Sequence, residues 1–239
     1  MRTVVLVHGA WHGPWCWAQV LAGLDELGVA SLAVDCGGPT LAADAETVRA
    51  VLDDLGAGAG VVLAGHSYGG AVITAAGTHR SVERLVYLCA FAPDADETVV
   101  GVARDHADPG DLGPAVEFGD DDTSTLDPKL VPDLLYGDCS AVDVARAIAL
   151  LRPHHAGTLT TPPGVAAWRT TPTTYVVCGA DRAVPPSLQR RMAERIPDVA
   201  LVEWPDASHS PFLSRPGDVT ALLAGLAGVA GLADEGAPA

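Results

Sequence analysis

Residues 61–70 read Val-Val-Leu-Ala-Gly-His-Ser-Tyr-Gly-Gly, an apolar run that passes directly into the pattern Gly-x-Ser-x-Gly centred on Ser67. The run predicts a buried strand, and the proline-free sequence after Gly70 predicts a helix. A serine between the two sits on a sharp turn, where the flanking glycines avoid collisions with neighbouring backbone. The helix N-terminus beside it favours developing negative charge. This context nominates Ser67 as a nucleophile; the bare motif is weak evidence in a chain with 26 glycines.

Short, β-branched-rich runs of the same kind recur along the chain and are typical of strands buried on both faces of a parallel sheet. They cover residues 3–7, 29–34, 61–64, 85–89, 174–178 and 200–204. Helix-compatible stretches lie between them, at residues 15–27, 43–56, 68–80, 186–195 and 216–230. The alternation predicts an α/β fold with a doubly wound, mostly parallel sheet of about six strands.

One segment breaks this alternation. Residues 91–170 are rich in Asp, Pro and Gly and contain one good helical run, at about 140–151. We expect a single domain over residues 1–239, with 91–170 inserted after the fourth strand as a small lid over the nucleophile. Residues 234–239 are expected to fray.

Charge and cysteine content limit the classes of partner. The formal charge of −16, from 30 acidic and 14 basic residues, argues against nucleic acid and against an anionic membrane surface. The N-terminal apolar run stops at His8, too early for a signal peptide or a membrane span. The five cysteines are odd in number and lack metal-ligand spacing, which favours free thiols and a cytoplasmic location. They are Cys16, Cys36, Cys89, Cys139 and Cys178.

A serine nucleophile needs a base, and His209 is the best placed histidine. It follows the last expected strand by five residues, in a loop that returns to the carboxyl edge of the sheet, where active sites of such sheets lie. His79 lies about 12 residues along a helix from Ser67, or roughly 18 Å, which is too far. The other histidines after Ser67 fall in the insertion and are expected to be solvated or to line a pocket: His106, His154 and His155.

The base needs a carboxylate to orient it, and Asp181 follows directly after the strand at 174–178. Asp206 and Asp35 are the competing candidates, and Asp206 after Pro205 is typical of a turn residue. The oxyanion needs backbone N–H donors. We expect one from Tyr68, which follows the nucleophile, and one from Ala10, in the loop after the first strand. The alternative is that the glycine before Ala10 merely makes a turn.

Three motifs together resemble the α/β-hydrolase superfamily: residues 8–17 (His-Gly-Ala-Trp-His-Gly-Pro-Trp-Cys-Trp), residues 65–70 (Gly-His-Ser-Tyr-Gly-Gly), and the late Asp181 and His209. More narrowly, the chain resembles small carboxylesterases related to plant methylesterases and hydroxynitrile lyases, including bacterial carboxylesterases and pyrethroid hydrolases. The first motif is the most specific, and the likeness extends over nearly the whole chain. The resemblance implies the α/β-hydrolase fold, a Ser-His-Asp triad, and no metal or organic cofactor.

Two positions discriminate within that family. The lyases carry threonine where Gly9 stands and lysine where Ser210 stands, to bind the cyanohydrin hydroxyl and the leaving cyanide. Their absence favours hydrolysis of a small to medium apolar carboxylic ester, a small-molecule substrate. The alternatives are a non-hydrolytic acyl transfer, lyase or biosynthetic step, or a ligand-binding protein on the hydrolase scaffold. An intact triad argues against the ligand-binding alternative, while water access to the acyl-enzyme would decide the others.

Aromatic residues of the first loop and the insertion are candidates for the walls of the substrate pocket. Each of them could equally pack in the core. Nothing in the sequence separates a methyl ester, an aryl ester, a lactone or an amide, and the oligomeric state is left open. The candidates are Trp11, His12, Trp15, Tyr136 and Trp168.

Overall fold

The computed structural model describes residues 1–56, 58–108 and 110–231; the expectation for 234–239 lies outside the described residues. A six-stranded sheet, with every pairing parallel, forms its centre, in the order β2-β1-β3-β4-β8-β9. The expected doubly wound sheet is therefore confirmed. Its strands are β1 (Thr3–Val7), β2 (Ser31–Val34), β3 (Val61–His66), β4 (Val82–Leu88), β8 (Thr173–Cys178) and β9 (Ala200–Trp204).

Strand boundaries differ from the sequence expectation mainly at β2 and β4. β2 begins two residues later than predicted, because Val29 N–H donates to Leu24 O at 2.9 Å and so closes the end of the preceding helix. β4 begins three residues earlier, at Val82, where its partner strand β3 shows a register shift between Val61 and Val62. Apolar patterning does not report such local hydrogen bonds.

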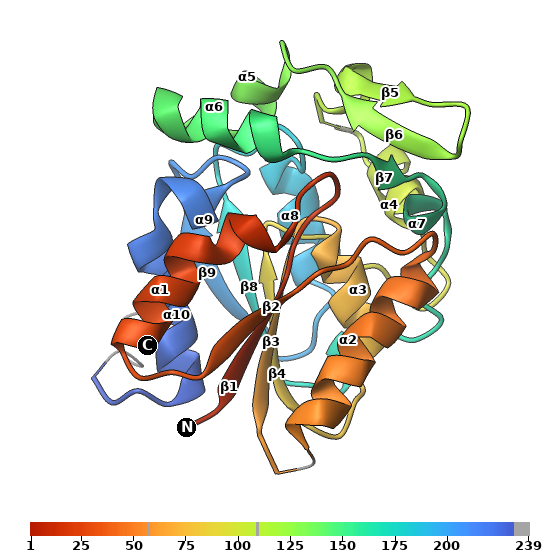
Figure 1. Ribbon diagram of the computed structural model, residues 1–239. Coiled ribbons are helices and arrows are strands. Elements are labelled where there is room, and N and C mark those ends of the chain that lie inside the picture. Colours follow the sequence, from red (N-terminus) through yellow and green to blue (C-terminus); the bar gives the residue numbers. More distant parts are fainter. Residues whose placement is uncertain (57, 109, 232–239) are drawn as a thin grey trace.

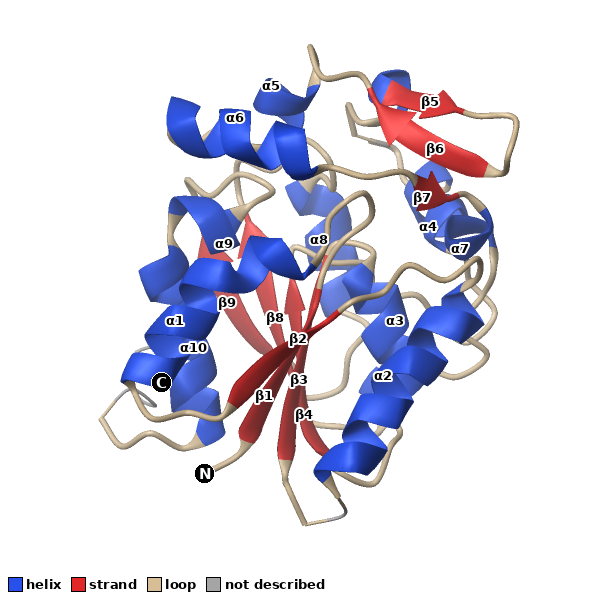
Figure 2. Ribbon diagram, in the orientation of Figure 1, coloured by secondary structure: helices blue, strands red, loops and turns tan. Residues whose placement is uncertain are grey.

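Helices cover both faces of the sheet (Figure 1 and Figure 2). Successive β1 side chains point to opposite faces, so Val4 and Leu6 pack with α1 and α10, while Val5 and Val7 pack on the side of α2, α3 and α8. All four valine and leucine side chains are fully buried. The helices are η1 (Pro14–Trp17), α1 (Ala18–Glu26), α2 (Leu41–Leu55), α3 (Gly69–Ala76), α8 (Pro186–Ala193), α9 (Pro211–Ser214) and α10 (Pro216–Ala227).

The segment between β4 and β8, which we call the insertion, lies above the carboxyl ends of the central strands (Figure 1). It contains α6, where the sequence predicted a helix, with Ser140 Oγ accepting from Asp143 N–H at 3.2 Å at its start. A three-stranded antiparallel sheet, β5-β6-β7, was not predicted, because its strands are short and polar. The elements are α4 (Val99–Arg104), η2 (Gly113–Ala115), β5 (Val116–Phe118), β6 (Thr123–Leu126), α5 (Val131–Leu135), α6 (Ala141–Leu150), β7 (His154–His155), α7 (Gly157–Thr160) and η3 (Ala167–Arg169).

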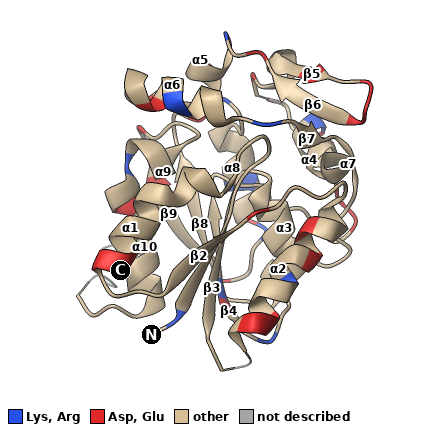
Figure 3. Ribbon diagram, viewed as in Figure 1, with Lys and Arg blue, Asp and Glu red and all other residues tan. Residues whose placement is uncertain are grey.

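Acidic side chains are spread over α2 and over the turn between β5 and β6 (Figure 3). The five cysteines, all within the described ranges, are free thiols. Across the described ranges, no helix combines the length and the apolar character needed to span a bilayer.

Candidate active site

The turn between β3 and α3 holds Ser67 in a left-handed backbone conformation, with φ of 52°. Such a φ is unfavourable for a non-glycine residue and persists only where the surroundings impose it. A Cβ on Gly65 would overlap Gly69 O, and a Cβ on Gly69 would lie 2.5 Å from Val7 O. Only glycine fits on either side of the serine, so the strand and the helix are packed in direct backbone contact. The serine itself is half-buried.

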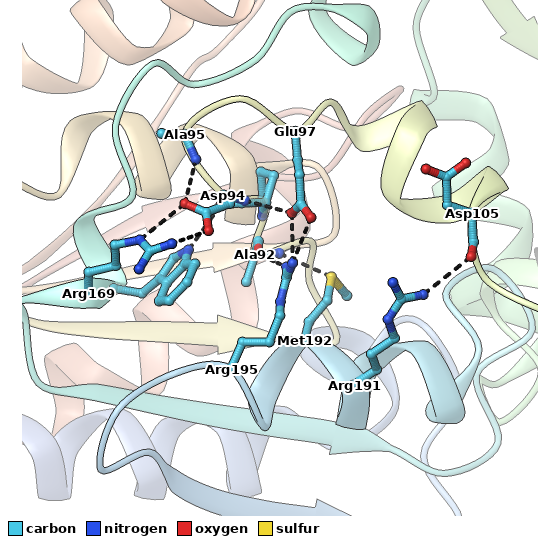
Figure 4. Close-up of polar contacts among 11 residues, drawn as sticks. Ala92, Asp94, Ala95, Glu97, Asp105, Arg169, Arg191, Met192 and Arg195 are labelled. Carbon is cyan, nitrogen blue, oxygen red and sulfur yellow. Dashed lines mark hydrogen bonds and ion pairs between the residues drawn. The ribbon is translucent and has the colours of Figure 1, made fainter.

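The loop after β4 braces this turn. Ser67 O accepts from Gly70 N–H and from Phe91 N–H, each at 3.0 Å. Figure 4 shows how Ala92, the next residue, is held by α8 and the segment after it: Ala92 N–H donates to Met192 Sδ at 3.3 Å, and Arg195 Nη2 donates to Ala92 O at 2.8 Å. The strained serine is thus held from both of its neighbouring strands.

The predicted base and acid are in direct contact. His209 Nδ1 lies 2.7 Å from Asp181 Oδ2, and both side chains are buried. The other carboxylate oxygen of Asp181 accepts from the N–H groups of Ala183 and Val184, at 2.8 and 2.9 Å. A carboxylate held by these donors keeps the imidazole proton on Nδ1, which leaves the Nε2 lone pair for a proton from a hydroxyl.

Gln189 also holds this acid, and sequence reasoning missed it. Its Nε2 donates to Asp181 Oδ2 at 2.9 Å and to Val184 O at 2.7 Å, while its Oε1 accepts from Cys178 N–H at 2.9 Å. The side chain is fully buried. Its position on the helix after the acid loop was the only signal in the sequence, and a glutamine at such a place carries no chemical signature.

The competing acids are elsewhere. Asp206 is exposed, in the turn after β9. Asp35 is 60% exposed and pairs with Arg152. Among the described residues, neither contacts His209 through a hydrogen bond or ion pair.

The other candidate histidines have partners of their own. The ring of His79 pairs with Asp53 at 3.2 Å, and that of His106 bonds Ser187 Oγ at 2.9 Å. His154 bonds Thr158 Oγ1 at 2.7 Å. His155 lies half-buried on the short strand β7.

Ser67 and His209 are brought together through His66. His66 Nε2 donates to His209 O at 2.7 Å, and the two rings lie 4.6 Å apart. Within the described residues, no hydrogen bond joins the Ser67 hydroxyl to His209 Nε2. In the free state of such sites this bond is often long and shortens when substrate is present.

The loop after β1 packs directly against the nucleophile. A Cβ on Gly9 would lie 2.8 Å from His66 Nδ1 and 3.0 Å from Ser67 Cβ, so the close approach requires glycine. Among the described residues, the N–H groups of Ala10 and Tyr68 have no hydrogen-bond acceptor. Unpaired donors beside a nucleophile suit the binding of an oxyanion.

Three of the five predicted pocket residues, His12, Trp15 and Tyr136, form one aromatic group around the first loop, and the ring of the fourth, Trp11, packs against His154. Tyr136 Oη and His12 Nε2 lie 2.8 Å apart, and the ring of Trp15 stacks on His12 at 5.4 Å. Trp11 is buried, and its Nε1 donates to Ser124 O at 3.2 Å. These contacts surround the loop itself, so they support its shape as much as they border a pocket.

Trp168 lies apart from that group. Its Nε1 donates to Pro93 O at 2.9 Å, and the guanidinium of Arg169 lies 5.0 Å from its ring. The adjacent Ala167 packs against Gly77, beyond the end of α3 that is farther from Ser67. These contacts are those of a packing residue, and none of them links Trp168 to the triad in the described part of the chain.

Three histidines around the site, His8, His12 and His66, are neutral near pH 7 because burial disfavours their charged forms and lowers their pKa values. The pKa of His12 falls to about 3. A neutral imidazole has one N–H donor and one acceptor nitrogen. Each of these rings can therefore hold a fixed tautomer near neutral pH.

One group of possible metal ligands occurs in the described residues: His66, Cys89 and His209, with ligand atoms within 4.8 Å of one another. The Cys89 thiol donates to His209 O at 3.4 Å, and burial raises its pKa, which keeps it protonated. His66 Nε2, Cys89 Sγ and His209 Nδ1 make hydrogen bonds of the site, whereas His66 Nδ1 has no partner among the described residues.

A cavity of about 230 Å³ lies between α4 and α8, lined by residues that include Leu188 and Met192 (Figure 4). Both of its arginines have partners: Arg195 Nη1 binds Glu97 at 2.8 Å, and Arg191 Nη1 donates to the backbone oxygen of Asp105 at 3.3 Å. None of Ser67, Asp181, His209, Gly9 and Ala10 is among its lining residues.

The sheet, the strained serine turn and the buried Asp-His pair define the chain as an α/β hydrolase. The model of the alpha/beta hydrolase family matches residues 4–222, and the chain belongs to this family. An alpha/beta hydrolase, nvfD, of Aspergillus novofumigatus is 32% identical over 95% of this chain and 97% of its own. Methylesterase 1 of Arabidopsis thaliana is 28% identical, over 89% and 90%.

Solved structures share the fold. A pyrethroid hydrolase from Sphingobium faniae has a TM-score of 0.81 and 23% identity, covering 95% of this chain and 97% of that one. A methylesterase from Arabidopsis has a TM-score of 0.77 and 24% identity, covering 93% and 97%. The fold implied by the sequence motifs is therefore confirmed over nearly the full chain.

Proposed function

We propose that this α/β hydrolase is a serine carboxylesterase that hydrolyses a small to medium apolar carboxylic ester. The observation that carries the proposal is the buried 2.7 Å contact of His209 with Asp181, on the same sheet edge as a strained, half-buried Ser67. Two relatives named as a methylesterase and a pyrethroid hydrolase support ester chemistry.

The proposed reaction is an acyl transfer in two halves. His209 Nε2 takes the proton of Ser67, whose Oγ adds to the ester carbonyl carbon. The N–H groups of Ala10 and Tyr68 bind the oxyanion, and the intermediate then collapses. The alcohol leaves with the proton from His209, and a water deprotonated by the same nitrogen releases the acid and restores Ser67.

Lyase chemistry is disfavoured at two positions. Gly9 has no room for a side chain beside Ser67, so no hydroxyl can be supplied there. Ser210, which follows the proposed catalytic histidine, is buried. Its side chain is uncharged, so it offers no cation for a leaving cyanide. Hydrolysis remains the function that these residues favour.

We also propose that residues 1–239 form one domain, with 91–170 as its lid, and that the enzyme acts on its small-molecule ester in the cytoplasm. Five free thiols support a reducing location. Electrostatic repulsion by the net charge of −16 disfavours nucleic acid and anionic membranes as partners.

Intact-mass labelling with a fluorophosphonate tests the proposal. The wild type should gain one adduct and hydrolyse p-nitrophenyl esters, while Ser67→Ala should do neither and keep its thermal midpoint. The preferred acyl length would then measure the pocket. Labelling without ester turnover would favour another acyl acceptor, and no labelling would favour a ligand-binding protein.

A further inference from the structure

The loop after β1 has an unusual hydrogen-bond pattern: four consecutive carbonyl oxygens accept from side chains or from the insertion. Trp11 O accepts from Arg152 N–H and His12 O from Arg152 Nε, both at 2.9 Å. Gly9 O lies 2.8 Å from His8 Nδ1, and Ala10 O lies 2.9 Å from His12 Nδ1. The loop therefore has little freedom to rotate its peptide groups. Trp11, with φ of 61°, adds strain that these bonds must hold.

The tautomer of His8 follows from its neighbours. Its Nε2 accepts from Cys36 N–H at 3.1 Å and lies 3.2 Å from Arg152 Nη2. A guanidinium has only donors, so this nitrogen carries no proton. The ring is neutral because burial lowers its pKa, and its proton is therefore on Nδ1, which donates to Gly9 O.

His12 has the same tautomer, and the donor to its Nε2 is Tyr136. Its Nδ1 lies against a carbonyl oxygen, which only accepts, so Nδ1 carries the proton and donates to Ala10 O. The remaining Nε2 accepts from the hydroxyl of Tyr136 at 2.8 Å. In both cases a donor from the insertion occupies one ring nitrogen and leaves the other to hold the loop.

These bonds orient a catalytic donor. In a trans peptide the C=O of one residue and the N–H of the next point in opposite directions. With Gly9 O held by His8, the N–H of Ala10 is turned away from His8. That N–H has no acceptor among the described residues, and its peptide neighbour Gly9 is in contact with the Ser67 side chain.

We propose that Arg152 and Tyr136 are positioning residues: each donates to Nε2 of one histidine and so favours the tautomer with the proton on Nδ1. His8 then holds the Gly9–Ala10 peptide, whose N–H is the oxyanion donor, and His12 holds the adjoining Ala10–Trp11 peptide. The proposal rests on the esterase function proposed above. It adds that catalysis depends on the position of the insertion relative to the loop after β1. Tyr136 and His12 are 124 residues apart, and Arg152 and His8 are 144 apart. A displaced insertion would release the loop and also the residues on either side of His209, because Ser208 Oγ donates to Asp138 and Cys139 Sγ donates to Ser210 O; single substitutions at Tyr136 and Arg152 leave those contacts in place.

The first test reads the tautomers directly. In the ¹⁵N-labelled wild type, long-range ¹H–¹⁵N spectra at pH 7 should show His8 and His12 neutral and protonated on Nδ1. Tyr136→Phe should populate the Nε2-protonated form of His12 and leave His8 unchanged. A wild-type His12 protonated on Nε2 would overturn the proposal, and this result does not depend on any ester being turned over.

The second test measures catalysis. Removing an oxyanion donor costs a factor of about 10² to 10³, and misplacing one costs less, so Tyr136→Phe should lower kcat roughly 10-fold with little change in KM. The Ki for a trifluoromethyl ketone, which mimics the tetrahedral intermediate, should rise by the same factor. Tyr87→Phe is the matched control, because its hydroxyl bonds only Thr74 Oγ1 in the described structure. It should match the wild type.

Conservative replacement separates positioning from packing. The amide N–H of His12→Asn can reach Ala10 O as Nδ1 does, whereas His12→Leu has no donor, so the asparagine variant should keep most of the activity that leucine loses. Because Tyr136 acts through His12, adding Tyr136→Phe to His12→Asn should cost no further activity. Additive losses would overturn the inference.

The outcomes also separate this proposal from the proposed function. Normal ester turnover with unchanged kcat in Tyr136→Phe and Arg152→Met would overturn the positioning role alone. If no ester is turned over, the fluorophosphonate labelling rate replaces kcat as the readout of the same variants. Loss of both labelling and turnover in the wild type would overturn the esterase proposal, and this inference with it.

Discussion

The serine turn and the oxyanion loop lie against each other, but they are fixed by different means. The turn around Ser67 is set by backbone contacts, which glycines within a few residues make possible. The loop at Gly9 and Ala10 is set by side chains, two of which, Tyr136 and Arg152, come from the insertion. The glycines that allow the turn thus stand within two positions of Ser67, whereas the side chains from the insertion that hold the loop come from more than a hundred positions away. The turn and the loop should therefore fail in different ways.

Asp181→Asn should have the largest effect, because it changes the partner of His209. The amide would favour the wrong tautomer of His209, and kcat should fall by about 10⁴ with the fold retained. Steady-state kinetics and a thermal melt would measure both. Asp206→Asn, at an exposed turn, should have wild-type kcat; a large loss there with little loss in Asp181→Asn would reassign the acid.

Gly9→Ala should break the contact between the loop and the serine turn. Its Cβ would meet His66 Nδ1 at 2.8 Å and Ser67 Cβ at 3.0 Å, so the loop must move away from the nucleophile. We expect kcat/KM to fall by about 10² to 10³, the cost of losing an oxyanion donor. Gly217→Ala, whose Cβ would meet nothing within 4 Å, is the control. Equal activity of the two variants would mean that the loop does not shape the site.

The sequence predicted the serine turn and the contact of Asp181 with His209 well. Strand periodicity, the glycines around Ser67, and the placement of acids and histidines after strands led to the sheet and to the contact of Asp181 with His209. It could not predict that Arg152 and Tyr136 hold the first loop. No sequence pattern around a tyrosine or an arginine indicates that its partner lies 124 or 144 residues away. The short strands of the insertion also lack the apolar alternation by which strands are predicted.

The central sheet and the outer sheet of the insertion should contribute differently to the free energy of unfolding. Leu63 is fully buried in β3, and Leu63→Ala should lower the free energy of unfolding by about 2 to 5 kcal/mol. Phe118 on β5 is 75% exposed, and Phe118→Ala should change it by about 0.5 kcal/mol or less. Urea unfolding would measure both. A large effect at Phe118 would indicate that this face of the insertion is covered in solution.

The pH dependence of stability sharpens the comparison at a single residue of the loop. Burial lowers the pKa of His12 to about 3, below its usual 6.5. Between these values the unfolded chain binds a proton at this site that the folded chain does not. The contribution of His12 to the free energy of unfolding should therefore be fully present above pH 6.5. It should fall toward pH 3 by about 1.4 kcal/mol per pH unit.

His12→Asn isolates that contribution, because asparagine does not titrate. Its unfolding free energy, measured by urea titration from pH 7 to pH 4, should decline less steeply than that of the wild type by about 1.4 kcal/mol per pH unit. Above pH 7 the two curves should run parallel, offset by whatever the substitution itself costs. Parallel curves over the whole range would mean that the pKa of His12 is the same in the folded and the unfolded chain. Below its usual pKa of 6.5, Nε2 would then carry a proton and could accept nothing from Tyr136, so the link from the insertion to the loop would be lost in acid.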